Sequence, residues 1–213
     1  PAAARADMFA PDGLPMPFIQ ASTSGLAVGV PGTLRGVDTA LRRWGTMSLA
    51  KTLAPAIELA EHGFRVNRFL AEDIARDDAR TQIQAETAAV FRPGGVPLVE
   101  GDWLVQPDLA KTLKLIAAKG PNVFYRGPIA RAIVKAQLRT RSELGAASQG
   151  RMTLADLARY QVAIRQPLIG HYRGWTLAGM PPPSSGGLTT FQMLKLLERF
   201  PLGDATQGYG FGS

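Results

Sequence analysis

The stretch Met180-Pro181-Pro182-Pro183-Ser184-Ser185-Gly186-Gly187 joins two segments whose apolar residues repeat with different periods. Three consecutive prolines favour an extended, rigid approach without internal hydrogen bonds. Ser-Ser-Gly-Gly then enters a helical segment, whose free N–H groups and positive end could hold an anion such as a carboxylate. Ser184, Ser185, Gly186 and Gly187 are therefore candidate substrate-binding residues. The alternative is a closely packed strand-to-helix turn in which the glycines allow backbone approach.

The segments that flank this turn predict a strand pair and then a helix. Apolar residues alternate loosely from Val162 to Leu177, with turn residues at Gly170 and at Arg173-Gly174, which is typical of a strand pair. From about Gly187 to Phe200 the apolar residues instead follow helical spacing. The period therefore changes from strand to helix at this turn.

Further towards the N-terminus, residues 30–160 predict a series of helices. Residues suited to the start of a helix precede runs of apolar residues at helical spacing: Pro31, Ser48, Asn67, Asp108, Pro128 and Thr153. Thr153 and Asp156 fit a capping box. Pro55 lies inside the second helix and is expected to kink or split it. Residues 140–151 are polar and contain Gly, so they predict a loop.

The resulting fold class is mainly α with a short β-strand pair near the C-terminus. Residues 1–213 are expected to form one helical segment. Within it, residues 1–29 are mostly loop, with a short helical piece possible near Ala2 to Phe9. Residues 30–160 are helical, and residues 161–200 hold the strand pair and then the last helix.

Composition excludes several kinds of chemistry. The chain has no Cys, so disulfides, thiolate catalysis and Cys-based zinc sites are absent. His62 and His171 are the only histidines and are not spaced like metal ligands, so we expect no metal and no cofactor. The Asp and Glu pairs lie beside Lys or Arg on helix faces, which is typical of solvated surface pairs. No catalytic residue is predicted in this chain.

The net charge of +7 raises the question of a polyanionic partner. The basic residues are spread along the helical segments, and no aromatic residues are interleaved with the denser basic stretches as a nucleic-acid platform requires. We therefore expect no nucleic-acid partner. No run of about 18 apolar residues occurs, so no membrane span is expected in this chain. No signal peptide is recognisable, so the sequence does not indicate a compartment directly.

Several motifs in one order resemble the γ-glutamyltranspeptidase family across nearly all of the chain. They are Val30-Pro31-Gly32-Thr33, Trp44-Gly45-Thr46-Met47, Pro55-Ala56-Ile57-Glu58-Leu59-Ala60, Gly63-Phe64, Val66-Asn67, Phe124-Tyr125-Arg126-Gly127-Pro128-Ile129-Ala130, residues 152–160, Tyr172-Arg173-Gly174-Trp175, residues 181–187 and Tyr209-Gly210-Phe211-Gly212-Ser213. This resemblance identifies the chain as an internal part of a large subunit.

The resemblance implies a precursor that cuts itself into two subunits and adopts a layered α-β-β-α N-terminal-nucleophile fold. An N-terminal Thr of the small subunit then attacks the γ-glutamyl carbonyl of glutathione or a related amide, with its own amine as the base. By the same resemblance, the Arg that binds the substrate carboxylate would precede Pro1 and the cleavage site would follow Ser213. Thr189-Thr190 lies inside a helical period and is not that site. The family's oxyanion-hole serines belong to the small subunit, so Ser184 and Ser185 do not take that role.

The implied partners are therefore the small subunit and a small-molecule γ-glutamyl substrate, and the isolated chain should be inactive. The implied location is periplasmic or extracellular. Two alternatives stay open. One is a related N-terminal-nucleophile acylase, acting on glutaryl β-lactams or on poly-γ-glutamate. The other is a helical nucleic-acid-binding module that would use the charge of +7 and the helix beginning at Thr153.

Overall fold

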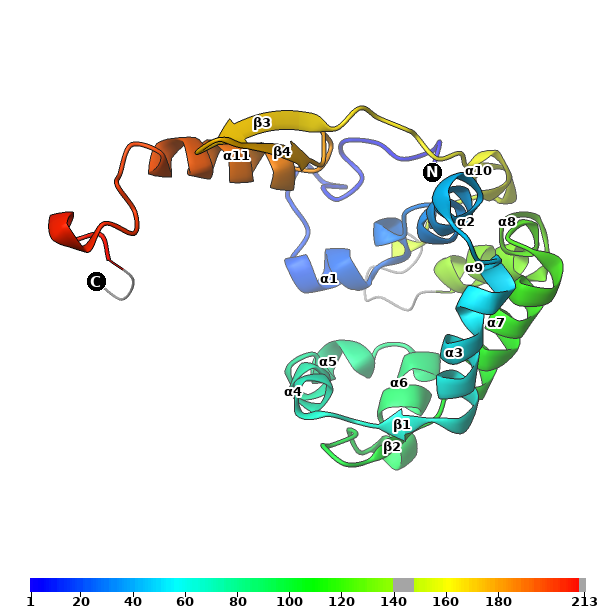
Figure 1. Cartoon of the computed structure of the whole chain (residues 1–213). Coiled ribbons are helices and arrows are strands. Elements are labelled where there is room, and N and C mark those ends of the chain that lie inside the picture. The colour runs from blue at the N-terminus through cyan, green and yellow to red at the C-terminus, as the bar shows by residue number, and fades with distance from the viewer. Residues whose placement is uncertain (140–147, 211–213) are drawn as a thin grey trace. The chain divides into compact units, whose positions relative to one another are not determined.

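The computed structural model describes residues 1–139 and 148–210 (Figure 1). It contains two compact units, Pro1–Val162 (unit 1) and Ala163–Ser213 (unit 2). Unit 1 is helical apart from one short strand pair, and unit 2 is a β-hairpin with one α-helix and a short 3-10 helix. The fold class predicted from the sequence, mainly α with a short strand pair near the C-terminus, is confirmed.

Unit 1 begins with turns, then α1 (Phe18–Thr23) and the 3-10 helix η1 (Gly25–Ala27). The α-helices that follow are α2 (Thr33–Trp44), α3 (Leu49–His62), α4 (Arg68–Arg76), α5 (Asp78–Thr81), α6 (Ala85–Phe91), α7 (Pro107–Lys119), α8 (Asn122–Arg126), α9 (Pro128–Leu138) and α10 (Leu154–Arg159). The 3-10 helix η2 (Pro93–Gly95) follows α6. Strands β1 (Phe64–Arg65) and β2 (Trp103–Leu104) pair antiparallel.

Local capping explains where several of these helices begin. Asn67 and Ser48 accept hydrogen bonds from the backbone N–H groups of Leu70 and Lys51. Thr153 and Asp156 form the expected capping box. A side-chain oxygen that accepts from these N–H groups satisfies donors for which a helix has no internal acceptor. The caps expected at Ser48, Asn67 and Thr153 are therefore confirmed, whereas the one expected at Asp108 is not.

Other boundaries differ from the sequence prediction. Helix α7 begins at Pro107 with Gln106 as its N-cap, so Asp108 lies in the first turn, where its carboxylate accepts from Lys111 at 2.9 Å. Pro55 does not split α3, which is one helix from Leu49 to His62. Proline removes only one backbone donor there, and α3 packs along α7. Residues 2–9 form turns rather than a helical piece.

Two clusters of buried side chains hold unit 1 together. One contains Val66, Ile74, Leu98 and Leu104, and it joins α4 to the β1–β2 pair. The other contains Tyr125, Ala130, Met152 and Leu157, and it joins α8, α9 and α10. Each cluster gathers segments that are far apart in the sequence. The predicted loop at 140–151 lies largely outside the described residues, because residues 140–147 are not described.

Unit 2 consists of β3 (Leu168–Tyr172), β4 (Trp175–Gly179), α11 (Gly186–Leu197) and the 3-10 helix η4 (Ala205–Gln207). Strands β3 and β4 pair antiparallel, with Leu168 opposite Gly179 and Tyr172 opposite Trp175. Gly170 is a strand residue and not a turn residue. Helix α11 lies along one face of this hairpin (Figure 1).

Candidate functional site

The turn between β4 and α11 is held by short-range hydrogen bonds. The backbone N–H of Ser184 donates to the carbonyl oxygen of Pro181 at 3.2 Å. The backbone N–H of Gly186 donates to Oγ of Ser184 at 3.3 Å. Ser185 is the N-cap residue, is exposed, and makes no side-chain cap bond. At the start of the 12-residue helix α11, the Ser184 hydroxyl therefore accepts a backbone hydrogen bond, whereas the Ser185 hydroxyl makes no cap bond.

Gly187 and Gly186 differ sharply in their surroundings. A Cβ added to Gly187 would meet the backbone oxygen of Met180 and would lie 2.9 Å from its backbone nitrogen. A Cβ added to Gly186 would have only Ser184 Oγ nearby, at 3.5 Å. Gly187 is thus required for close packing of α11 on the end of β4, whereas the space at Gly186 is open. Gly187 thus has the packing role that the sequence offered as the alternative to substrate binding, in which glycine allows the backbone to approach closely.

The same four residues are those predicted from the sequence to bind substrate. The N–H groups of Gly187 and Leu188 fall in the first turn of α11, where the helix offers no acceptor of its own. Such groups, together with the Ser185 hydroxyl, favour an anion over a cation. The assignment of Ser184, Ser185, Gly186 and Gly187 to substrate binding stays a prediction.

Glycines also shape the rest of unit 2. The ring of Phe191 in α11 lies over Gly170 and Gly179, and a Cβ on either glycine would come within about 3.1 Å of that ring. Each glycine therefore makes room for the aromatic side chain on the inner face of the hairpin. This pair was not predicted from the sequence, although glycine within a strand is a signal for close approach.

Arg173 lies in the hairpin turn, as the sequence predicted, but its side-chain hydrogen bonds were not predicted. Its φ of 47° is in the left-handed region, and Gly174 beside it has φ 85°. Its guanidinium donates to the carbonyl oxygens of Phe200 at 2.6 Å and Leu202 at 3.1 Å. Its backbone N–H donates to the Glu198 carboxylate at 3.0 Å. The hydrogen bond from Lys195, and then that from Arg173, lower the pKa of Glu198. One residue thus joins the hairpin turn to the segment that follows α11.

In unit 1, three of the quoted motifs meet at one buried side chain. Tyr125 donates its hydroxyl to the carbonyl oxygen of Pro31 at 2.9 Å and accepts from the backbone N–H of Arg35 at 3.1 Å. The ring of Tyr160 stacks on that of Tyr125 with 6.0 Å between centroids. Gly32 lies against the Tyr160 hydroxyl. Burial raises the pKa of Tyr125 above its ordinary value, despite the opposing effect of Arg35.

Arg35 takes part in the same packing. Its guanidinium lies 4.4 Å from the centre of the Tyr125 ring and donates to the Asn122 side chain at 3.2 Å. Cation–π contact and a hydrogen bond to α8 explain how a long charged residue is accommodated near the start of α2. These motifs therefore position backbone segments and supply no reactive group.

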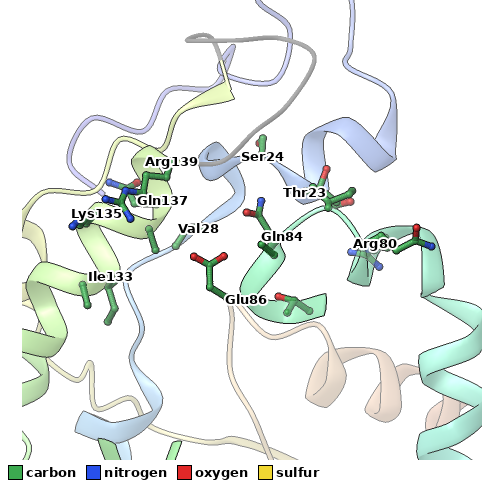
Figure 2. Close-up of a pocket in the computed structure, with 17 residues that line it drawn as sticks. Thr23, Ser24, Val28, Arg80, Gln84, Glu86, Ile133, Lys135, Gln137 and Arg139 are labelled. Atoms are coloured by element: carbon green, nitrogen blue, oxygen red, sulfur yellow. The ribbon is translucent and has the colours of Figure 1, made fainter. Parts of the chain in front are cut away.

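A cavity of about 1240 Å³ lies between α1, α6 and α9 in unit 1. Figure 2 shows Glu86 from α6 and Lys135 from α9 on opposite sides of it. Glu86 is the only carboxylate among the described lining residues, so the cavity offers no acid/base carboxylate pair. Because its lining comes from separate segments, no sequence pattern predicted it.

The described part of the chain also shows no metal-binding cluster. Over residues 1–139 and 148–210, no group of three or more His, Asp or Glu side chains comes together in a way that could hold an ion. His171 Nδ1 lies 3.2 Å from Thr176 Oγ1 on the hairpin, and His62 is at the end of α3. Within the same residues, no helix has the length and apolar character needed to cross a membrane.

Comparison with known proteins accounts for this set of packing motifs. The sequence matches the family described as Gamma-glutamyltranspeptidase over residues 1–209. The chain belongs to the γ-glutamyltranspeptidase family. It is 45% identical to the glutathione hydrolase proenzyme of Bacillus subtilis (strain 168), over 95% of this chain and 33% of that protein. It is 44% identical to the acylase ACY 1 proenzyme of Pseudomonas sp. (strain SE83), over 88% of this chain and 31% of that protein.

A solved structure shows the same fold. The crystal structure of Helicobacter pylori γ-glutamyltranspeptidase superposes with a TM-score of 0.88 at 34% identity, covering 100% of this chain and 58% of that chain. This γ-glutamyltranspeptidase family chain spans about a third of the length of the curated relatives that it matches. The motif-based recognition of the family is confirmed.

Proposed function

We propose that this chain is part of the large subunit of a proenzyme that transfers or hydrolyses the γ-glutamyl group of glutathione and related γ-glutamyl amides. The observation that carries the proposal is the family match over residues 1–209. The name of the Bacillus subtilis relative, a glutathione hydrolase proenzyme at 45% identity, supports the substrate. The reaction is an acyl transfer to water or to an acceptor amine.

In this proposal the chain supplies the scaffold and part of the lining of the substrate site, while the nucleophile lies in another segment of the precursor. The described residues fit that division. The side chains of Tyr125 and Arg173 donate hydrogen bonds to backbone carbonyl oxygens. The Asp156 carboxylate accepts hydrogen bonds in the capping box of α10. A nucleophilic N-terminal Thr, whose free amine acts as the base, would come from the small subunit. The small subunit and a small γ-glutamyl compound are the proposed partners.

The test is a comparison of the full-length protein with the 213-residue chain. Each is incubated with a γ-glutamyl anilide, and release of the aromatic amine is followed by absorbance. We expect turnover by the full-length protein after it has cleaved itself, and none by the 213-residue chain. Turnover by this chain alone would contradict the division of roles. An inactive but correctly cleaved full-length protein would contradict the substrate.

A second candidate is a related acylase, because the chain is 44% identical to the acylase ACY 1 proenzyme of Pseudomonas sp.. Both reactions would use an acyl-enzyme, so they differ in which acyl group the pocket accepts. Measuring kcat/KM of the full-length protein on glutathione and on a glutaryl amide separates them. A higher kcat/KM on the glutaryl amide would favour the acylase. Poly-γ-glutamate as a third substrate in the same assay tests the depolymerase alternative.

We also propose a periplasmic or extracellular location and no nucleic-acid partner. The absence of Cys is compatible with an oxidising compartment, since no thiol is exposed to it. The helix that the nucleic-acid alternative would use, α10, has only six residues. Recovery of the processed protein only from the cytoplasm would contradict the proposed location. Tight, sequence-dependent binding to duplex DNA would contradict the proposal that there is no nucleic-acid partner.

A further inference from the structure

The proposed function assigns no role to the cavity between α1, α6 and α9. All of the residues that line this cavity belong to unit 1. Its volume of about 1240 Å³ is larger than the roughly 300–1000 Å³ that is typical of pockets for small molecules. A ligand of the size of a short peptide therefore fits inside it.

The end of helix α9 gives one wall of the cavity a positive charge. Lys135 and Arg139 line this wall four positions apart, and residues at that spacing lie on one face of a helix. Neither side chain forms an ion pair or a hydrogen bond with another described residue. Arg80, a third cation of the lining, is paired with Asp77 at 3.4 Å. The two cations of the α9 wall are therefore available to carboxylates of a ligand.

The opposite wall has a negative charge and a buried hydrogen-bond donor. Figure 2 shows Glu86 and Gln84 across the cavity from Lys135 and Arg139. Glu86 is exposed and has no cationic partner among the described residues. The Nε2 atom of Gln84 is buried, and no described residue accepts a hydrogen bond from it. Because buried donors in proteins generally have an acceptor, a carbonyl oxygen of a ligand would satisfy Gln84.

The α1 side of the cavity adds hydroxyl oxygens that can accept hydrogen bonds. Thr23 Oγ1 donates to the carbonyl oxygen of Ile19 at 2.6 Å, and Ser24 Oγ donates to that of Ala21 at 2.7 Å. Each hydroxyl proton is thus used within α1 and its C-cap, while each oxygen keeps lone pairs. Such oxygens favour a donor group, and an ammonium group is one.

We propose that this cavity binds a short acidic peptide with a free N-terminus, whose carboxylates contact Lys135 and Arg139 and whose ammonium group contacts Glu86. A simple anion would be repelled by Glu86, and a simple cation by the two side chains of the α9 wall. A ligand with one ammonium group and two carboxylates complements both walls, and its peptide carbonyl supplies the acceptor for Gln84. The inference goes beyond the proposed function, because it concerns a binding site and no step of acyl transfer.

The probe is alanyl-aspartate, an α-linked dipeptide with one ammonium group, two carboxylates and no γ-glutamyl group. Isothermal titration calorimetry of the full-length protein and of the 213-residue chain should show saturable binding of one dipeptide per molecule. Lys135→Gln and Arg139→Gln should each raise Kd at least about five-fold, because each removes a charge-assisted hydrogen bond. Lys119→Gln is the matched control, because it removes the same charge from an exposed residue of α7 outside the cavity. It should change Kd by less than about two-fold.

A second comparison tests the ammonium contact. Glu86→Gln should raise Kd for alanyl-aspartate at least about five-fold. N-acetyl-alanyl-aspartate keeps both carboxylates and has no ammonium group, so it should bind the unmodified protein more weakly, and Glu86→Gln should not weaken its binding further. Circular dichroism of each variant checks that the fold is kept, as expected when exposed side chains are replaced.

Four results would overturn the proposal. The absence of saturable binding at millimolar dipeptide would mean that the cavity takes no such ligand. Binding that Lys135→Gln and Arg139→Gln leave unchanged, or that Lys119→Gln weakens equally, would place the dipeptide elsewhere. Equal binding of the acetylated dipeptide would reduce the cavity to a site for simple anions. Binding by the 213-residue chain but not by the full-length protein would mean that other segments of the precursor fill the cavity.

Discussion

The Tyr125 hydroxyl lies 2.9 Å from the carbonyl oxygen of Pro31, 94 positions earlier in the chain, and donates a hydrogen bond to it. The Tyr125 hydroxyl oxygen also accepts a hydrogen bond from the backbone N–H of Arg35. The phenol thus joins α8 to the turn that starts α2. Because Tyr125 is fully buried, both bonds form away from water.

Tyr125→Phe is expected to lower the free energy of unfolding by about 1–3 kcal/mol, since it leaves the part-buried Pro31 carbonyl and Arg35 N–H without their partner. Chemical denaturation followed by circular dichroism measures this loss. Tyr160→Phe is the control, because it keeps the stacked ring while removing a hydroxyl for which no hydrogen bond is described. A loss in the control as large as that in Tyr125→Phe would contradict the explanation.

The buried phenol also predicts a dependence on high pH. Burial raises the folded-state pKa of Tyr125 above the ordinary value of 10.0, so the folded protein disfavours the phenolate. Stability from this group is complete below pH 10 and declines as the pH rises through the folded-state pKa. We expect Tyr125→Phe to show a smaller fall in Tm between pH 9 and 11 than the unmodified protein. Parallel curves would exclude Tyr125 as the source of the alkaline sensitivity.

These contacts show which parts of the structure the sequence could predict. The caps at Ser48, Asn67 and Thr153 each involve residues three positions apart, so a short pattern contains all the necessary information. The contact between Gly32 and Tyr160 and the β1–β2 pair join segments that are far apart in the chain. No local pattern carries that information, and the sequence predicted neither.

The candidate turn illustrates the same limit. The proline and glycine composition predicted a rigid turn into a helix, and that turn is present between β4 and α11. What the sequence could not separate is the packing role of Gly187 from the open position of Gly186, because that difference depends on where Met180 lies. A pair of substitutions at adjacent glycines therefore tests the structure directly.

Gly187→Ala should be destabilising and Gly186→Ala should not. A methyl group at residue 187 meets the backbone of Met180, which cannot move without displacing β4 from α11, so we expect a loss of about 1–3 kcal/mol. At residue 186 the space is open and alanine favours a helix, so we expect a gain of up to about 1 kcal/mol. Urea unfolding of both variants measures the contrast, and equal effects would contradict it.

Asp156 gives an acid-side prediction. Its carboxylate accepts from the backbone N–H of Ala2 at 2.7 Å and from Thr153 in the capping box. These bonds, that from Ala2 first, lower the pKa of Asp156 from 3.8 to about 2. The stability they provide is present above pH 3.8 and is lost as the pH falls towards 2, because the carboxyl group then becomes protonated.

Asp156→Asn should therefore cost about 0.5–1 kcal/mol near pH 7, a modest value because the residue is only partly buried and solvent screens its charge. The difference from the unmodified protein should shrink between pH 4 and 2. Asp12→Asn, at an exposed residue with no described hydrogen bond, is the control. A difference that stays constant down to pH 2 would mean that the carboxylate charge is not involved.

Substitutions at Arg173 can separate the contribution of the left-handed backbone to stability from that of the side-chain hydrogen bonds. Arg173→Ala removes the bonds to the carbonyl oxygens of Phe200 and Leu202 and keeps a Cβ at φ 47°, so we expect about 1–2 kcal/mol of destabilisation. Arg173→Gly removes the same bonds but relieves the left-handed backbone, so it should cost less than the alanine variant. Thermal unfolding of the full-length protein gives both values. If glycine were the more damaging of the two, the turn would not be strained.

Pro55 gives the last prediction, because the split that the sequence allowed for at this residue is absent from α3. A proline inside a helix lacks one donor and crowds the carbonyl four residues earlier, at a cost of about 3 kcal/mol in an unsupported helix. Helix α3 nevertheless continues through it while packing along α7, and the Lys114 ammonium of α7 pairs with Glu61 near the end of α3. Tertiary contact therefore offsets the local penalty.

If that explanation holds, Pro55→Ala should raise the free energy of unfolding by about 1–2 kcal/mol, because it restores the missing hydrogen bond while Pro55 itself is exposed. Ala54→Pro provides the opposite change one residue earlier, where a native N–H is lost, and should be strongly destabilising. Urea unfolding compares the two. A loss of stability in Pro55→Ala would show that proline itself sets the path of α3 against α7, beyond being tolerated there.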